Sequence, residues 1–246
     1  MEKQAFTSHI SERLNNSLED VFNSILEMGG LAESQLNNAI EALVHGDVNR
    51  AEEVIVLDKA LNMAEFDIER QCANIFARQQ PAASDLRLTI VAIRIAIDLE
   101  RIGDETVKVA KMVKVFIKQG QKSCDDIPGY SQLLDMSYRA VNMLHSTLDA
   151  FSKLTVKDAL LVIDEEEKID ELFKEAYAEI ISGFKSSPEK AECIAQLLLS
   201  ARAIERVSDH VRNIIENLIY LINGKDIRVM DKKSMISLLN KMERAE

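Results

Sequence analysis

Two pairs of carboxylates are the residues of this 246-residue chain whose type and spacing could do chemistry. Glu100 and Asp104 lie four residues apart, and Glu205 and Asp209 repeat that spacing later in the chain. On an α-helix this spacing places two side chains about 40° apart on one face, where like charges cost about 0.2–0.5 kcal/mol. A compensating cation is therefore expected. Carboxylate oxygens suit hard or borderline metal ions, so the sequence predicts that both pairs bind Mg²⁺, Mn²⁺ or Fe.

A simpler interpretation is that these carboxylates are solvated or are neutralised by basic residues on their own helices. Lys108 follows Asp104 by four residues, and Arg212 follows Asp209 one turn later, which are spacings that allow ordinary ion pairs. Spacing alone leaves both interpretations open, and only the duplication of the pair favours a metal.

Three further residues are weaker candidates for metal ligands. Asp58 and Asp164 lie on the preceding helices and could complete each acidic cluster, and Asn213 occupies in the second half the place of Lys108 in the first. Acidic residues on helix surfaces are common, so their weight is small. His210 directly follows Asp209 and points about 100° away from it, which argues against a metal shared with that residue.

The chain contains none of the common catalytic or cofactor-binding motifs. Neither H-E-x-x-H, G-x-x-x-x-G-K-[ST], G-x-S-x-G nor G-x-G-x-x-G is present, and no Glu is followed by His three residues later, as in di-iron bundles. We therefore predict no catalytic residue, no organic cofactor and no enzymatic activity.

The elements that carry these carboxylates are expected to be helices. Hydrophobic residues make up 47% of the chain and aromatic residues only 5%, with few Gly and Pro to form the turns of a sheet protein. Periodicity and turn signals predict six long helices, followed by a short polar helix, at about residues 10–44, 48–77, 85–118, 130–154, 156–184, 188–223 and 232–246.

An internal repeat organises these helices. Two apolar seams with alternating spacings of four and three align when Leu88 is placed on Cys193, and the same alignment places Glu100 on Glu205. The seams are Leu88, Ala92, Ile95, Leu99, Ile102, Thr106, Val109 and Val113, and Cys193, Leu197, Ser200, Ile204, Val207, Val211, Ile214 and Leu218. The fold class predicted is all-α, with two pseudo-symmetric three-helix bundles in residues 1–119 and 130–224, a linker at 120–129 and a C-terminal tail at 225–246.

Charge and composition narrow the partners and the location. A net charge of −11 and a pI near 5.0 argue against nucleic acid and disfavour an anionic membrane surface. The N-terminal residues lack the pattern of a signal peptide, no stretch is apolar enough for a membrane span, and three dispersed Cys suggest no disulfide framework. A cytoplasmic location is expected.

Several long words of the sequence resemble the PhoU family of regulators of phosphate-specific transport. These words are RQQPAASDLR at residues 78–87, DLERIGD at 98–104 and its echo ARAIERVSD at 201–209, with Met28-Gly29-Gly30 and the segment 224–228 in support. The resemblance runs over nearly the whole chain. It implies two three-helix bundles in pseudo-twofold arrangement.

The resemblance also implies a function and partners. It implies a negative regulator that links the transporter ATPase PstB to the sensor histidine kinase PhoR and represses the phosphate regulon when phosphate is abundant. Metal binding in the family, in some members as iron clusters, carries over to Glu100 with Asp104 and to Glu205 with Asp209, although Ser208 stands where the family favours Gly. We also expect a homodimer that reaches membrane complexes only through its partners.

Three functions remain open from the sequence. The first is the signalling adaptor just described. The second is a metal-binding bundle with storage or phosphohydrolase activity, which would use the same carboxylates. The third is a scaffold whose acidic pairs only keep the surface soluble.

Overall fold

The computed structural model describes residues 12–118 and 126–243, and this part of the chain is all-α with no strand. The predicted fold class is therefore confirmed. The helices are α1 (Glu12–His45), α2 (Val48–Gln79), α3 (Ala83–Lys118), α4 (Tyr130–Lys153), α5 (Ala159–Ser186), α6 (Ala191–Asn223) and α7 (Lys232–Glu243), with short 3-10 turns at Pro188–Lys190 and Ile227–Val229.

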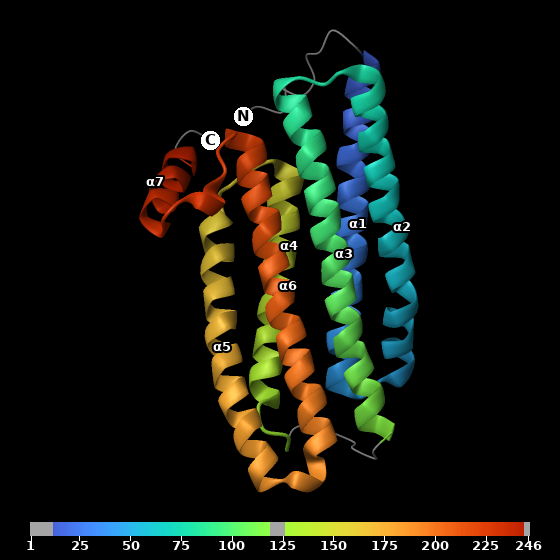
Figure 1. The fold of residues 1–246 in the computed structure, drawn as a ribbon, viewed down its shortest axis with the longest axis vertical. Coiled ribbons are helices and arrows are strands. Elements are labelled where there is room, and N and C mark those ends of the chain that lie inside the picture. Colours follow the sequence, from blue (N-terminus) through green and yellow to red (C-terminus); the bar gives the residue numbers. More distant parts are fainter. Residues whose placement is uncertain (1–11, 119–125, 244–246) are drawn as a thin grey trace.

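The six long helices run along the long axis of the molecule in two groups (Figure 1). Helices α1, α2 and α3 pack on one side, and α4, α5 and α6 pack on the other, while α7 lies outside the second group near one end. Helix α3 of the first group and helix α6 of the second lie side by side, and their contact is the most extensive between any two described helices. The two bundles are thus joined through the pair of helices that carry the repeated carboxylates.

The two predicted apolar seams form the centre of this arrangement. Every residue of both seams is buried, and Ile95, Leu99, Ile204 and Val207 are fully inaccessible to solvent. One continuous hydrophobic cluster extends across both bundles. Because burying a large aliphatic side chain contributes about 1.5–3 kcal/mol, the seams are a main source of the stability of this contact.

The turns between the helices follow local chemistry. Gly46 adopts a left-handed conformation after α1, and Asp47 then caps α2 by accepting a hydrogen bond from the amide of Arg50 at 3.1 Å. The fifth helix begins at Ala159 instead of the expected residue 156. Leu154 is left-handed and closes α4, and the amide of Ala159 donates to the carbonyl of Val156 in the turn that follows.

A small residue allows the two bundles to approach each other a second time, between α1 and α4. A Cβ placed on Gly29 would lie 2.5 Å from Cδ2 of Leu148, whereas one placed on Gly30 would meet nothing within 4 Å. Gly29 therefore supplies space for the α1–α4 contact, and its neighbour does not.

None of the helices in residues 12–118 and 126–243 is both long and apolar enough to cross a lipid bilayer.

Candidate functional site

The first predicted pair lies in an acidic cluster between α2 and α3, formed by Asp58, Glu65, Glu100 and Asp104. Burial raises the pKa of Glu100, and the charges of Asp104, Glu65 and Asp58 raise it further. Burial is the main cause that raises the pKa values of Asp58 and Glu65, and Asp104 raises both further, while a hydrogen bond with Gln35 offsets part of the increase for Asp58. The structure thus brings together Asp58, Glu100 and Asp104 as the sequence predicted, and it adds Glu65.

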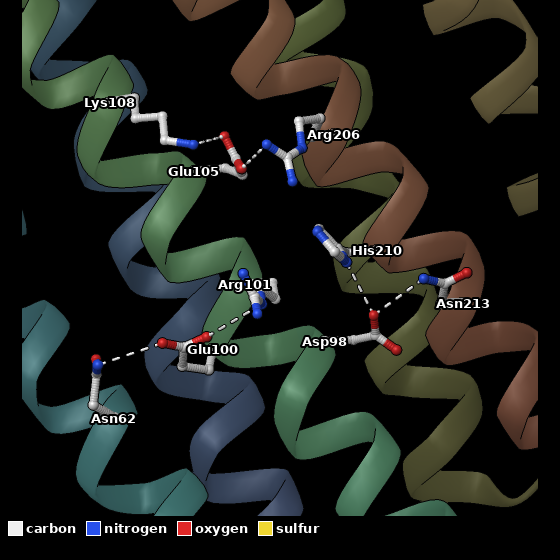
Figure 2. Close-up of polar contacts among 9 residues, drawn as sticks. All are labelled: Asn62, Asp98, Glu100, Arg101, Glu105, Lys108, Arg206, His210 and Asn213. Carbon is white, nitrogen blue, oxygen red and sulfur yellow. Dashed lines mark hydrogen bonds and ion pairs between the residues drawn. The ribbon is translucent and has the colours of Figure 1, made fainter.

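Glu100 has only weak compensation in this cluster (Figure 2). Nδ2 of Asn62 donates to its Oε1 over 3.4 Å, and Nε of the neighbouring Arg101 lies 3.9 Å from its Oε2. The side chain of Glu100 is nevertheless only 15% exposed. A largely buried carboxylate whose nearest polar contacts are this long is stabilised when it gains a proton or binds a cation.

Two buried oxygens beside Gly103 reinforce this conclusion. Gln35 donates its amide to the carbonyl of Val54 at 3.1 Å, and its Oε1 has no hydrogen-bond partner. Oδ1 of Asp58 has none either. A Cβ placed on Gly103 would lie 3.0 Å from the Gln35 oxygen and 3.3 Å from the Asp58 oxygen, so both acceptors face the same small volume. A proton on Asp58 or a cation would satisfy them.

The second predicted pair lies in a matching cluster between α5 and α6, formed by Glu166, Asp170, Glu205 and Asp209. Burial is the main cause that raises the pKa values of Glu166, Glu205 and Asp209, and the charge of Asp170 raises each of them further. Basic residues compensate this cluster better than the first one. Arg212 donates to Glu166 over 2.6 Å, and Arg202 donates to Glu205, whose Oε2 has no partner.

Two of the weaker metal-ligand candidates for this cluster, Asp164 and Asn213, have other surroundings in the structure. Asp164 is exposed on α5, and the carboxyls of that helix that lie near Asp209 are Asp170 and Glu166, of which Glu166 is only 6% exposed. The pattern of buried residues could have identified it. Ala51, Val54, Leu61, Ile68, Cys72 and Ile75 of α2 recur with the same spacing as Ala159, Val162, Ile169, Ala176, Ile180 and Gly183 of α5, which places Glu166 on Asp58.

Lys108 and Arg212 do form ion pairs, but their partners are not Asp104 and Asp209. Nζ of Lys108 lies 2.6 Å from Glu105, and Arg212 donates to Glu166 and to Glu216. Asn213, the third weaker candidate, donates instead to Oδ1 of Asp98 at 3.1 Å. Lys108 and Asn213 therefore act in contacts other than the acidic clusters.

The contact of Asn213 with Asp98 belongs to a set of polar bridges between α3 and α6 (Figure 2). Nδ1 of His210 lies 2.9 Å from Oδ1 of Asp98, and Nη1 of Arg206 lies 3.0 Å from Oε1 of Glu105. Asp98 and Glu105 are 8% and 3% exposed. Neither residue is predicted from the sequence, because helical periodicity shows that a position faces inward without showing which polar side chain it contacts.

The two acidic clusters offer oxygen atoms of the kind that hard cations bind. Their donors are carboxylate and amide oxygens, and three of the buried oxygens, on Gln35, Asp58 and Glu205, have no partner. Among the described residues, however, no group of three or more His, Cys, Asp or Glu side chains is already arranged to hold a metal ion. Metal binding would require these side chains to move together.

Comparisons with known proteins identify relatives of the whole chain. A family model described as the PhoU domain matches twice, at residues 25–113 and 133–218. The phosphate-specific transport system accessory protein PhoU homolog of Pseudomonas putida is 38% identical over 233 residues, which are 95% of this chain and 90% of that protein. The corresponding accessory protein PhoU of Escherichia coli K12 is 32% identical over 240 residues, 97% of each chain.

Solved structures agree with these matches. A crystal structure of PhoU from Pseudomonas aeruginosa has a TM-score of 0.81 and 37% identity, covering 86% of this chain and 99% of that one. The phosphate transport system regulatory protein PhoU from Streptococcus pneumoniae has a TM-score of 0.78 and 30% identity, covering 88% and 100%.

Replacing Glu100 with Gln should stabilise the protein at neutral pH by about 0.5 kcal/mol, because it removes one like charge. The folded pKa of Glu100 is raised above its ordinary value of 4.5, so the stabilisation from its proton is complete below 4.5 and is lost as pH rises through the folded value. The advantage of Glu100→Gln should therefore shrink as pH falls toward 4.5. Urea denaturation at a series of pH values measures this difference.

The matched control for this prediction is Glu175→Gln, which removes an exposed carboxylate from α5. It should change the free energy of unfolding by less than about 0.5 kcal/mol at every pH. A Glu100→Gln variant that is less stable than the parent protein at pH 7 would show that the carboxylate has a compensating partner.

Proposed function

The chain belongs to the PhoU family, and we propose that it is an accessory regulator of a phosphate-specific transport system. In this proposal it links the transporter ATPase PstB to the sensor histidine kinase PhoR and represses the phosphate regulon when phosphate is abundant. We further propose that it acts in the cytoplasm as a homodimer. The observation that carries the proposal is the match to relatives named as accessory and regulatory proteins over both halves of the chain.

Protein contact, not catalysis, is the activity proposed for this fold. The buried carboxylates lie on the flanks of long helices, and two surface hollows of the described residues are grooves between helices. The groove between α1 and α2, of about 590 Å³, is lined mostly by uncharged polar side chains such as Asn23, Asn74 and Gln71. This arrangement supports a molecule that works through its outer surface.

One exposed region of α2 has the character of a protein-binding surface. Val56, Met63 and Phe66, which we call the α2 apolar face, are 68%, 69% and 64% exposed and lie on one side of the helix. Exposed apolar groups that are close together, with charged residues around them, are typical of interaction sites. Glu52 and Asp67 border the face but pair with Lys114 and Arg70, so the border is not left acidic and we propose that the face docks a partner surface with an apolar centre.

Replacing the α2 apolar face with polar residues should abolish regulation without unfolding the protein. The variant Val56→Ser, Met63→Gln, Phe66→Ser should reduce co-purification of PstB or PhoR from phosphate-grown cells by about tenfold or more, because buried aromatic and apolar anchors dominate interface energy. A phosphate-regulated reporter should be derepressed in the same cells. The unfolding free energy should change little, since all three side chains are exposed.

The matched control replaces three exposed apolar residues elsewhere, with Leu161→Ser, Tyr177→Ser and Leu199→Ser. This variant should bind and repress as the parent does. Wild-type binding by the α2 variant would exclude this surface. If deletion of the whole gene left the reporter unchanged with and without phosphate, the regulatory function itself would be excluded.

A second proposed activity is cation binding at the two acidic clusters, with the unpartnered oxygens of Gln35, Asp58 and Glu205 as the specific support. A Mg²⁺, Mn²⁺ or Fe ion would offset the repulsion that helps to raise the pKa values of Glu100 and Glu205. The ion would act in regulation, and the alternative of a storage or phosphohydrolase bundle would use the same carboxylates.

Saturating Mn²⁺ should raise the unfolding temperature of the parent protein, because a ligand that binds only the folded state stabilises it. The increase should be lost when Glu100→Gln, Asp104→Asn, Glu205→Gln and Asp209→Asn are combined. The control Glu171→Gln with Glu175→Gln removes an exposed pair of the same spacing from α5 and should keep the increase. An equal shift in both variants would exclude these clusters, and turnover of phosphate esters would favour the hydrolase alternative.

A further inference from the structure

The turn that follows α6 and helix α7 form a basic region on this acidic chain. Basic residues outnumber acidic ones in residues 224–243, although the chain as a whole carries −11. Lys225, Lys233 and Lys241 surround a groove of about 460 Å³ that is also lined by Ser234 and Ser237, with Met230 and Leu238 as its apolar part. We call this hollow the C-terminal lysine groove.

Two acidic residues close in sequence to the lysines of the groove form hydrogen bonds with other groups. Asp226 accepts hydrogen bonds from the guanidinium and the amide of Arg228, which lower its pKa to about 2. Asp231 accepts from the amide of Ser234 at 3.0 Å and from its hydroxyl at 2.7 Å. Among the ion pairs of the described residues, none involves Lys225, Lys233 or Lys241. Because three lysines and no acidic residue line the groove, the lining has a net positive charge.

The groove is also built on a packed platform. Met235 and Leu239 of α7 are 5% and 0% exposed, and Ile227 in the preceding turn is 2% exposed, so the lysines are attached to anchored backbone. Val229, next to the groove residue Met230, is 87% exposed, which is the highest exposure among the large apolar residues described. The exposed apolar side chain of Val229 thus lies beside the C-terminal lysine groove.

We propose that the C-terminal lysine groove docks directly on an anionic phospholipid surface. The lysine ammonium groups would bind the phosphate groups of the lipids, and Val229 would enter the headgroup region. Lysines close to an anionic bilayer each strengthen binding by about fivefold, and an apolar side chain beside them adds to this. The positive charge of the groove decides this contact, and not the net charge of −11 of the whole chain, because salt screens electrostatic attraction beyond about 10 Å.

The placement of α7 suits such a contact. It stands outside the second bundle, beside the upper part of α5 and α6 in Figure 1, and on the side away from α1, α2 and α3. The acidic clusters lie on α2 with α3 and on α5 with α6, along the bodies of the bundles. A membrane that contacts α7 would therefore meet the basic region and not the acidic clusters. It would also place a regulator beside a membrane transporter without requiring a protein bridge, which goes beyond the proposed function.

Vesicle co-sedimentation of the purified full chain tests this proposal without any partner protein. The chain should bind vesicles containing about one third phosphatidylglycerol at least tenfold more tightly than vesicles of phosphatidylcholine alone, and added salt should weaken the binding. The variant Lys225→Gln, Lys233→Gln, Lys241→Gln should lose at least tenfold of this affinity. Val229→Ser should weaken binding without altering its salt dependence.

The matched control removes three exposed lysines from other places, with Lys59→Gln, Lys174→Gln and Lys185→Gln, and has the same net charge as the test variant. It should bind as the parent does. Equal losses in the two variants, or equal binding to neutral and anionic vesicles, would overturn the proposal. Release from vesicles by millimolar inorganic phosphate at constant ionic strength would assign the groove to a soluble anion and would overturn it too.

Discussion

The packing of α3 against α6 is the interaction on which the rest of the structure depends. Two apolar seams with the same alternation of spacings meet there, and they bury aliphatic side chains from both halves of the repeat in one core. Polar bridges cross the contact at fixed positions, through Asp98 with His210 and Glu105 with Arg206. Displacing one helix along the other would separate the buried carboxylate of Asp98 from His210 and Asn213 of α6, which costs several kcal/mol. The polar pairs therefore fix the register that the apolar seams leave undetermined.

The same packing explains why the repeated carboxylates lie in surroundings that disfavour their negative charge. Each seam turns one face of its helix inward, so residues at the edge of that face, such as Glu100 and Glu205, are carried into partial burial. Burial and neighbouring carboxylates then raise their pKa values. Basic side chains relieve the second cluster through Arg202 and Arg212, and the first cluster keeps its unpartnered oxygens on Asp58 and Gln35. The two halves of the repeat thus share geometry but differ in charge compensation.

Much of the fold was predictable from the sequence, because both seams follow helical periodicity and Gly46 and Pro81 mark two of the turns. The membership of Glu100, Asp104, Glu205 and Asp209 in two acidic clusters followed from the duplication. The polar contacts were not predictable, because Asp98 meets His210 across a long sequence separation that periodicity does not encode. Acidic surroundings alone predict Asp164, whereas the buried pattern that relates α5 to α2 identifies Glu166. Net charge likewise concealed a basic region at α7.

Native-state hydrogen exchange of the full chain tests most directly whether the α3–α6 contact makes the two bundles one cooperative unit. The account predicts that the central amides of α3, at residues 95–113, and of α6, at residues 204–218, exchange through the same opening, with the same free energy and the same dependence on urea. Exchange of the whole first bundle at a lower free energy, while the central amides of α6 stay protected, would contradict it.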